Sequence, residues 1–261
     1  MKYAIMSDAH SNPAALELAL KDAKKRKCEK FVFLGDTTGY GYDVKTTLKL
    51  VKDSFDVVVM GNHDAVCSGL DNDKYTRINA HYDIDRAQGQ VIAEADIDWL
   101  RKLKLGYKSR DFLGVHGDFI DPRSWGYIIE PEEVWLNFTA NEERVMFCGH
   151  SHHATVWELK GGKKLANKFE AKFRKPATEA ESITFKLSPE NRYIINVGSV
   201  GYPRHDLCST YAIFDSVAQR VTIRRLPFDF KGYIKAMLAA KIDLPQWLQE
   251  ILMIALAKMN G

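Results

Sequence analysis

The sequence predicts an α/β fold in which a β-sandwich is flanked by helices. In the first half of the chain, short apolar runs alternate with stretches of helical periodicity, which is typical of parallel strands joined by right-handed crossovers. From Thr155 onward, short runs with strand character follow one another, separated by glycine, proline and asparagine. We find no linker and no internal repeat, so we expect one domain over residues 1–261.

The first half of the chain starts with strand, loop and helix. Tyr3–Met6 is a predicted strand, and Asn12–Lys27 is a predicted helix with Asn12 as its cap and Pro13 in its first turn. The unit repeats with a strand at Phe31–Leu34 and a helix at Val44–Ser54. Further buried strands are predicted at Val57–Met60, Phe112–Val115 and Val145–Cys148.

The remaining segments differ in periodicity. Helical periodicity dominates residues 65–110, so we expect a helical insertion that closes near Leu103 and Leu105 and forms a wall or cap of a site. Residues 231–261 predict a helical tail with a break near Leu244-Pro245. Strands are predicted at Thr155–Leu159, Lys160–Lys164, Ser182–Leu187, Tyr193–Val197, Ser209–Asp215 and Arg220–Leu226.

Composition and charge exclude several classes of protein. The net charge of +3 is too small to imply nucleic-acid binding by itself. No apolar run reaches the roughly 18 residues of a membrane span, and Met1–Met6 is too short for the core of a signal peptide. The cysteines show no paired spacing, so disulfides are not expected. We therefore expect a cytoplasmic enzyme that binds neither membranes nor nucleic acid.

Polar clusters follow the predicted strands directly. In sheets of α/β type, ligands bind at the carboxyl ends of the strands. Taken singly, Asp8 is better explained as a helix cap and His116 as a core histidine, but all the clusters in order favour a shared site. The clusters are Asp8-Ala9-His10, Gly35-Asp36, Gly61-Asn62-His63-Asp64, His116-Gly117-Asp118 and Gly149-His150-Ser151-His152.

These residue types suit a centre of two cations. A hydroxide held between cations about 3.5–4 Å apart can attack phosphorus in line. Such a centre needs a bridging carboxylate, for which Asp36 is the best candidate, and terminal imidazole, carboxylate or amide ligands. The absence of thiolates from the clusters favours manganese, iron, nickel or zinc in such a centre over a structural zinc site, and manganese is our first candidate.

The motifs resemble those of the calcineurin-like metallophosphoesterase superfamily. Gly35-Asp36-Thr37-Thr38-Gly39-Tyr40-Gly41 and Asn196–Arg204, followed by Thr210–Ile213, look like its small prokaryotic single-domain branch. The resemblance runs from about Met1 to Leu226. It implies a four-layered α/β/β/α sandwich of two mixed sheets flanked by helices.

The resemblance also implies the roles of individual residues. A first metal would be bound by Asp8, His10, Asp36 and His152, and a second by Asp36, Asn62, His116 and His150. His63 would be the general acid beside the leaving oxygen, and Asp64 would orient its imidazole. The alternative for His63 is a hydrogen bond without proton transfer.

Departures from related families bear on the substrate. Thr37-Thr38-Gly39-Tyr40 replaces the Val-Asp-Arg-Gly of protein phosphatases, so the phosphate-gripping arginine of those families is missing. Asp118 stands where relatives carry a small Ser or Thr, and its negative charge could repel dianionic monoesters or add a contact beside the centre. The alternative is a solvated loop residue. Arg204 and His205 are candidates for phosphate or base contacts. Tyr40 could stack on a nucleobase, although packing is favoured.

We therefore expect a hydrolase of small phosphodiesters or phosphomonoesters, with nucleotides among its candidate substrates. Asymmetric hydrolysis of a dinucleoside polyphosphate is a close alternative. A protein phosphatase and a non-catalytic scaffold of the same fold are minor alternatives. The sequence does not specify an oligomeric state.

Overall fold

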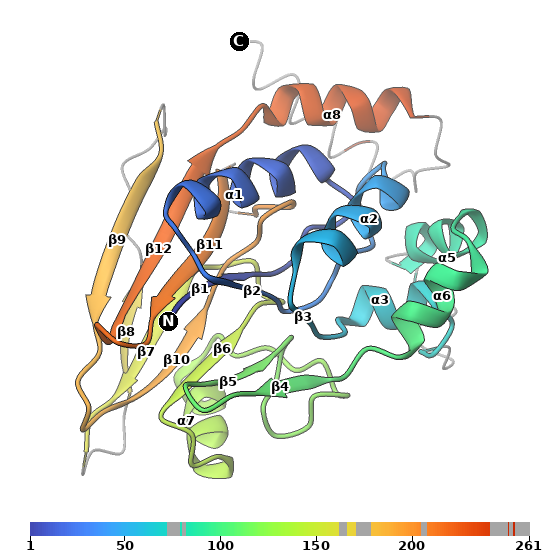
Figure 1. The fold of residues 1–261 in the computed structure, drawn as a ribbon. Coiled ribbons are helices and arrows are strands. Elements are labelled where there is room, and N and C mark those ends of the chain that lie inside the picture. The colour runs from blue at the N-terminus through green and yellow to red at the C-terminus, as the bar shows by residue number, and fades with distance from the viewer. Residues whose placement is uncertain are drawn as a thin grey trace.

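Two six-stranded mixed sheets lie face to face at the centre of the fold (Figure 1). The computed structural model describes residues 1–71, 79, 82–161, 166–170, 179–204, 208–240, 250 and 253. The first sheet has the order β3 (Val57–Val58), β2 (Lys30–Phe33), β1 (Lys2–Met6), β11 (Cys208–Asp215), β12 (Arg220–Pro227) and β9 (Glu181–Lys186). The second has the order β4 (Gly106–Lys108), β5 (Leu113–Val115), β6 (Val145–Cys148), β10 (Arg192–Asn196), β7 (Thr155–Leu159) and β8 (Asn167–Glu170).

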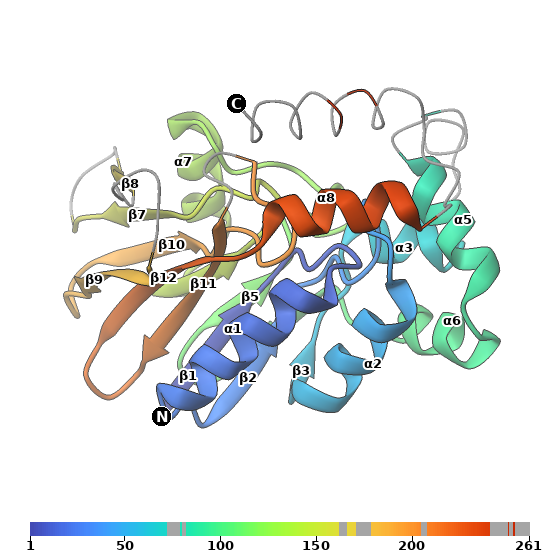
Figure 2. The ribbon, with the colours of Figure 1, turned by 90° about the horizontal axis from the view of Figure 1, so that it is seen from above.

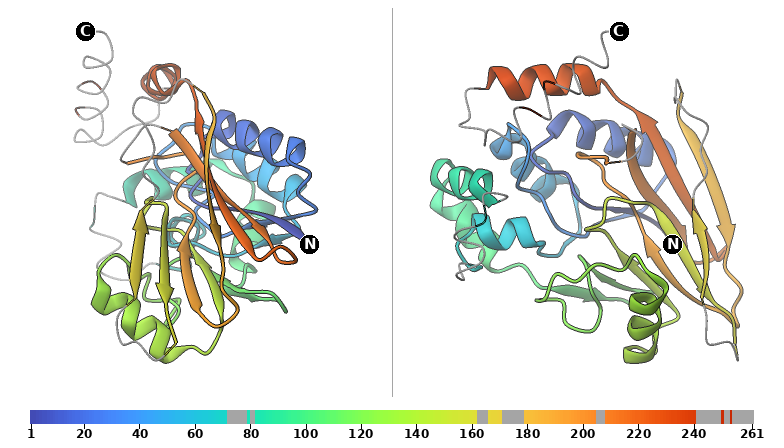
Figure 3. Two further views of the ribbon diagram at one scale, coloured as in Figure 1. Left: turned by 90° about the vertical axis from the view of Figure 1, so that its left-hand side faces the viewer. Right: turned by 180° about the vertical axis from the view of Figure 1, so that it is seen from behind.

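Helices cover the outer faces of both sheets (Figures 2 and 3). Helices α1 (Pro13–Lys25) and α2 (Val44–Ser54) pack on the first sheet, with α8 (Phe230–Ala239) on the same side, and α7 (Pro131–Ala140) packs on the second. Helices α3 (Asn62–Cys67), α5 (Asp83–Val91) and α6 (Glu94–Arg101) gather beyond one end of the sheets (Figure 1). The predicted four-layered α/β/β/α sandwich is confirmed.

Strand β1 shows why its sequence is apolar throughout. Tyr3 and Ile5 face the core between the sheets, whereas Ala4 and Met6 face α1. Successive side chains of a strand point to opposite faces, so a strand covered on both faces buries every position. The core between the sheets is built largely of aromatic and β-branched residues, including Phe112, Phe147, Ile195, Phe214 and Ile223.

Several predicted elements are confirmed with small shifts of their bounds. Asn12 caps α1 by accepting a hydrogen bond from the Ala15 N–H at 3.2 Å, and Pro13 is the first residue of that helix. The prediction that a helix closes near Leu103 and Leu105 is wrong, because α6 ends at Arg101. The following segment is extended, since the Lys104 carbonyl accepts the Met60 N–H at 2.9 Å and Gly106 starts β4.

Other predictions reach beyond the described residues. Most of the predicted strand Lys160–Lys164 lies outside them, and β8 at Asn167–Glu170 is the strand that pairs with β7. The helical tail is described as α8, and the predicted break at Leu244-Pro245 also falls outside. No helix in the described ranges is long and apolar enough to cross a membrane.

The loops that follow the strands are held side by side by their own backbones. The Asp8 N–H donates to the Gly35 carbonyl at 2.9 Å, and the His10 N–H donates to the Asp36 carbonyl at 3.1 Å. In the second sheet, the Gly149 N–H donates to the His116 carbonyl at 2.8 Å. The polar clusters after different strands are therefore brought to one edge of the sandwich.

Candidate metal centre and active site

Three histidines turn their Nε2 atoms into a common cluster. His10, His116 and His152 each place Nδ1 within hydrogen-bond reach of a backbone carbonyl, those of Thr38, Leu34 and Tyr202 respectively. With Nδ1 donating a proton to a carbonyl, the lone pair of a neutral ring lies on Nε2. This arrangement is typical of histidines that bind metal ions.

Two buried carboxylate oxygens face these nitrogens without a hydrogen bond. Asp8 Oδ1 lies 3.2 Å from His152 Nε2, and Asp36 Oδ2 lies 3.2 Å from His116 Nε2. Neither oxygen accepts a hydrogen bond from the described residues. Unsatisfied buried anionic oxygens are costly, so this pair is best explained by cations that fill the cluster.

The ligand atoms fall into overlapping groups. Those of Asp8, His10 and His152 lie within 4.8 Å of one another, as do those of Asp36, His116 and His150. Burial lowers the pKa of His10 and of His150 to about 3, which favours the neutral ring that a metal ligand needs; burial acts in the same direction on His116, but the charge of Asp36 raises its pKa to about 9. The structure therefore brings together the carboxylates and imidazoles that the sequence predicted for two metals.

Asn62 presents its amide oxygen to the second group. Asn62 Oδ1 lies 3.1 Å from His116 Nε2, while its Nδ2 donates to the Tyr82 hydroxyl at 3.3 Å. The Tyr82 hydroxyl can accept this hydrogen bond from the amide nitrogen, which leaves the amide oxygen facing His116. Sequence reasoning missed Tyr82, which belongs to the helical insertion.

The backbone of the cluster is strained. Asp8, Asp36, His150 and His152 have φ between 58° and 65°, and His10 has φ of 46°. Residues other than glycine rarely adopt this left-handed backbone conformation, which costs of order 1–3 kcal/mol for each residue. Such strain concentrated in the proposed ligands supports a functional role for the cluster.

His63 is held by Asp85, which sequence reasoning also missed. His63 Nδ1 lies 2.8 Å from Asp85 Oδ2, and both side chains are buried. Burial opposes protonation, but the charges of Asp85 and Asp36 raise the pKa of His63 above its usual range. The ring also contacts His10 and Tyr40, with centroids 4.9 Å and 4.7 Å away.

The prediction that Asp64 orients His63 is wrong. Asp64 accepts backbone N–H groups from Asp36, Thr37 and Gly61 at 2.9, 2.9 and 3.1 Å, and it also accepts the Thr38 N–H. As the third residue of α3, its side chain turns back toward the helix start. Burial and the charge of Asp36 raise the pKa of Asp64 to about 7. Asp64 therefore joins the loops that carry the ligands.

Helix α5 is fastened to the loop after β2. Gln88 Oε1 accepts the Gly39 N–H and the Ser11 hydroxyl at 2.8 and 3.1 Å, and its Nε2 donates to the Gly41 carbonyl at 2.8 Å. Gly39 has φ of 89°, and a Cβ there would lie 2.6 Å from His63 Nδ1. A glycine at this position therefore leaves room for the His63–Asp85 contact.

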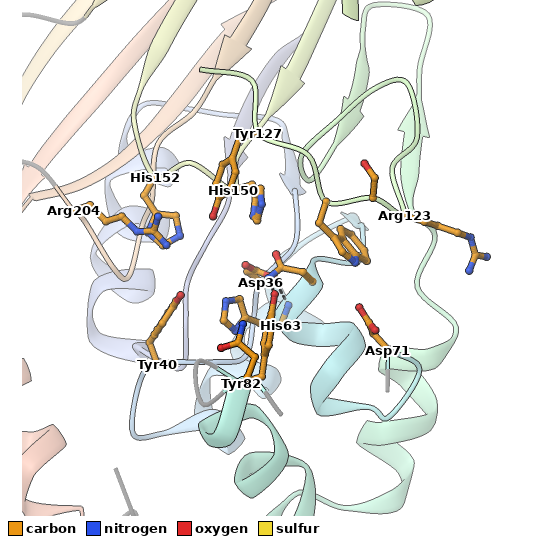
Figure 4. Close-up of a pocket in the computed structure, with 14 residues that line it drawn as sticks. Asp36, Tyr40, His63, Asp71, Tyr82, Arg123, Tyr127, His150, His152 and Arg204 are labelled. Atoms are coloured by element: carbon orange, nitrogen blue, oxygen red, sulfur yellow. Dashed lines mark hydrogen bonds between the residues drawn. The ribbon is translucent and has the colours of Figure 1, made fainter. Parts of the chain in front are cut away.

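A cavity of about 690 Å³ opens over the cluster (Figure 4). Arg204 and His152 lie at one end of it, and Arg123 and Asp71 at the other. Tyr40 also lines the cavity but is only 2% exposed and stacks on Tyr202 at 4.5 Å, as the packing alternative predicted.

The other substrate candidates have different outcomes. Asp118 does not line this cavity: its carboxylate accepts the Ile120 N–H at 2.6 Å and lies against Gly126. The Asp118 carboxylate therefore contacts residues of its own loop and does not face the cavity. His205 lies outside the described residues.

Comparison with known proteins gives one family and several relatives. The chain matches the calcineurin-like phosphoesterase superfamily domain over residues 1–219. It is 30% identical over 260 residues to an uncharacterized protein of Methanocaldococcus jannaschii, covering 96% of this chain and 97% of that protein.

Solved structures share its fold. A metallophosphoesterase from Sphaerobacter thermophilus is 30% identical with a TM-score of 0.79, covering 97% of this chain and 98% of the other. A hypothetical protein from Pyrococcus horikoshii has a TM-score of 0.71 at 16% identity, covering 96% and 97%. The similarity extends over nearly the whole length of all these chains.

Proposed function

The chain belongs to the calcineurin-like phosphoesterase superfamily, and we propose that it hydrolyses small phosphodiesters or phosphomonoesters with two divalent cations. The observation that carries this proposal is the pair of buried oxygens, Asp8 Oδ1 and Asp36 Oδ2, which accept no hydrogen bond among the described residues. Imidazole nitrogens surround both, so the donor set suits cations that prefer nitrogen and oxygen ligands.

The residues would divide between two sites as the sequence predicted. Asp36 would bridge, with Asp8, His10 and His152 on one side and Asn62, His116 and His150 on the other. When bound, divalent cations lower the pKa of a water molecule and neutralise phosphoryl oxygens. Manganese is our first candidate, since no thiolate takes part in the cluster.

His63 would protonate the leaving oxygen of the ester. Its Nδ1 faces Asp85 Oδ2, which leaves Nε2 as the atom that can hold the transferable proton. Asp85 would fix the rotation of the ring and its tautomer, and would stabilise the charged form. A positioned general acid of this kind contributes about 10²–10⁴-fold to the rate.

Arg204 would bind the substrate's phosphate. It lines the cavity near Tyr127. Burial opposes the charge of its guanidinium, but the neighbouring Tyr40 and Tyr127 raise the pKa of Arg204 above its usual range. The planar guanidinium matches two phosphate oxygens at once. Arg204 would thus bind the phosphate in place of the arginine that is missing from the loop after Asp36.

A panel of substrates with each of several divalent metals tests the proposal. It comprises bis-p-nitrophenyl phosphate, p-nitrophenyl phosphate, cyclic nucleotides and diadenosine tetraphosphate. We expect hydrolysis of the simple esters that a chelator abolishes and manganese restores. The proposal fails if no ester is hydrolysed with any metal and the purified chain binds none.

The second candidate is asymmetric hydrolysis of a dinucleoside polyphosphate. The arginines at opposite ends of the cavity favour it, because they could hold phosphates on both sides of the centre. Activity on diadenosine tetraphosphate far above that on the diesters would select this candidate.

We further propose a cytoplasmic location and a small phosphate ester or nucleotide, rather than nucleic acid, as the partner.

A further inference from the structure

A second cavity of about 410 Å³ adjoins the one over the cluster. Asp71, Arg123 and Trp125 line both cavities, so the two are neighbours at these side chains. Arg123 and Asp71 stand at the end of the first cavity that is opposite Arg204 (Figure 4). We call the second cavity the annex. A ligand bound over the cluster can extend into it past Trp125.

Most of the residues that line the annex are apolar, and the charged side chains of Asp71, Arg101 and Arg123 line it as well. Its aliphatic lining comes from the insertion and from the strand before it: Met60, Ala65, Leu70, Leu103 and Leu105. Leu70 is 53% exposed, so its side chain is accessible at the annex. An aliphatic floor beside an indole suits a planar apolar group, and Arg123 can stack on such a ring.

His63 and Trp125 contact different parts of the cluster. The His63 ring lies 4.9 Å from that of His10, whereas the Trp125 ring lies 6.1 Å from that of His116. Under the proposed function, the leaving oxygen must face His63 to receive its proton. A diester carries a second ester group, which is retained in the product and must lie elsewhere. The annex offers space for it.

We infer that the annex binds the retained ester group of a phosphodiester and prefers an aromatic one, an aryl group or a nucleobase. This inference rests on the proposed function and narrows it from phosphate esters to diesters. Trp125 is then a residue that determines specificity, and it acts by binding rather than by proton transfer. The backbone of Trp125 is strained, since its φ is 54°.

The test uses esters that share the leaving group p-nitrophenolate. Bis-p-nitrophenyl phosphate retains an aryl group and methyl p-nitrophenyl phosphate retains a methyl group, and kcat/KM for each is divided by its uncatalysed rate. The manganese-loaded full chain should prefer the aryl diester by about tenfold, the scale of one aromatic stacking contact. Trp125→Ala should bring this ratio close to one, chiefly through KM, and Trp125→Phe should keep most of it.

A second variant avoids the strained position of Trp125. Leu70→Ala changes an exposed side chain and should lower the same ratio by a smaller factor, with the thermal unfolding midpoint and bound manganese unchanged. The inference is overturned if the native chain shows no aryl preference, or if Trp125→Ala and Leu70→Ala both leave the ratio as it was. Absence of manganese-dependent hydrolysis of all the esters, p-nitrophenyl phosphate included, would instead refute the proposed function.

Discussion

His63 Nδ1 lies 2.8 Å from Asp85 Oδ2, and this contact joins the first turn of α3 to α5 of the helical insertion. The Asp85 side chain is fully buried and that of His63 is 4% exposed, so solvent does not compete for the contact. A carboxylate on Nδ1 fixes the tautomer and direction of the ring. The insertion therefore supplies part of the candidate active site and does not merely cover it.

Asp85→Asn should slow the hydrolysis of esters with poor leaving groups. The amide has the same shape but can offer N–H to Nδ1, which favours the wrong tautomer of His63. We expect kcat for an alkyl leaving group to fall about 100-fold, within the range of general-acid catalysis, and kcat for p-nitrophenolate to fall much less. Steady-state kinetics over a series of leaving groups measures the difference.

The control for Asp85→Asn lies on the same helix. Asp83 is 50% exposed and pairs with Arg86, so Asp83→Asn should leave kcat unchanged for every leaving group in the series. His63→Ala should retain the metal and lose activity on esters with alkyl leaving groups. Adding Asp85→Asn to His63→Ala should lower kcat little further. Loss of bound metal in Asp85→Asn, or an equal fall for every leaving group, would show that Asp85 supports the fold instead.

Gly39→Ala should disturb the same contact from the opposite side. Its Cβ would lie 2.6 Å from His63 Nδ1, and the φ of 89° disfavours any L side chain. We expect activity to fall with a destabilisation of about 1–2 kcal/mol, the usual cost of a left-handed residue. Denaturant unfolding and kinetics measure both, and Gly161→Ala, where a Cβ meets nothing closer than 3.7 Å among the described residues, is the matched control. An active, stable Gly39→Ala chain would contradict this account.

Asp36→Asn should abolish activity and metal binding together. Asp36 Oδ2 is the buried oxygen near both His10 and His116, at 3.7 and 3.2 Å, and the substitution removes the charge that would bridge two cations. Metal analysis of the purified variant checks the prediction. Asp118→Asn is the control, since Asp118 does not line the cavity and should leave metal content unchanged. Full metal content in Asp36→Asn would require another bridging ligand.

The sequence predicts local relationships better than distant ones. Asp8, Asp36 and His150 were found because each ends an apolar run, and the carboxyl ends of neighbouring strands meet at one edge. The prediction for Asp64 is wrong because adjacency along the chain does not imply contact: its carboxylate faces backbone N–H groups and not the His63 ring. Its position three residues after Gly61 was the available signal, since an acidic residue there turns back to cap its helix.

Asp85 and Tyr82 could not be found by the same reasoning. They are separated from His63 and Asn62 by 22 and 20 residues respectively, and no motif precedes them. Their contacts depend on how α5 packs, which Gln88 settles by hydrogen bonding to the loop at Gly39. Likewise, β4 was missed because its pairing with β5 is a tertiary contact that three residues of sequence do not reveal.

Asp22 should make stability depend on pH at the acid end. Arg224 is almost fully buried, and its Nε and one Nη donate to the Asp22 carboxylate at 2.8 Å each, while the Tyr211 hydroxyl donates at 2.7 Å. Burial opposes ionisation, but these hydrogen bonds hold the pKa of Asp22 below its usual value. The depressed pKa means that the contribution is full above the unfolded value of about 4 and is lost as pH falls below it.

Asp22→Asn measures this contribution. At pH 7 we expect the free energy of unfolding to fall by about 3 kcal/mol, because the substitution leaves the Arg224 charge buried without its counterion. The gap between native and variant chains should narrow at pH 3, where the native carboxyl begins to take up its proton. Asp53→Asn, which removes an exposed pair with Lys49, should change stability by less than about 1 kcal/mol at either pH. If the Asp22→Asn gap were as wide at pH 3 as at pH 7, its source would be packing of the side chain and not its charge.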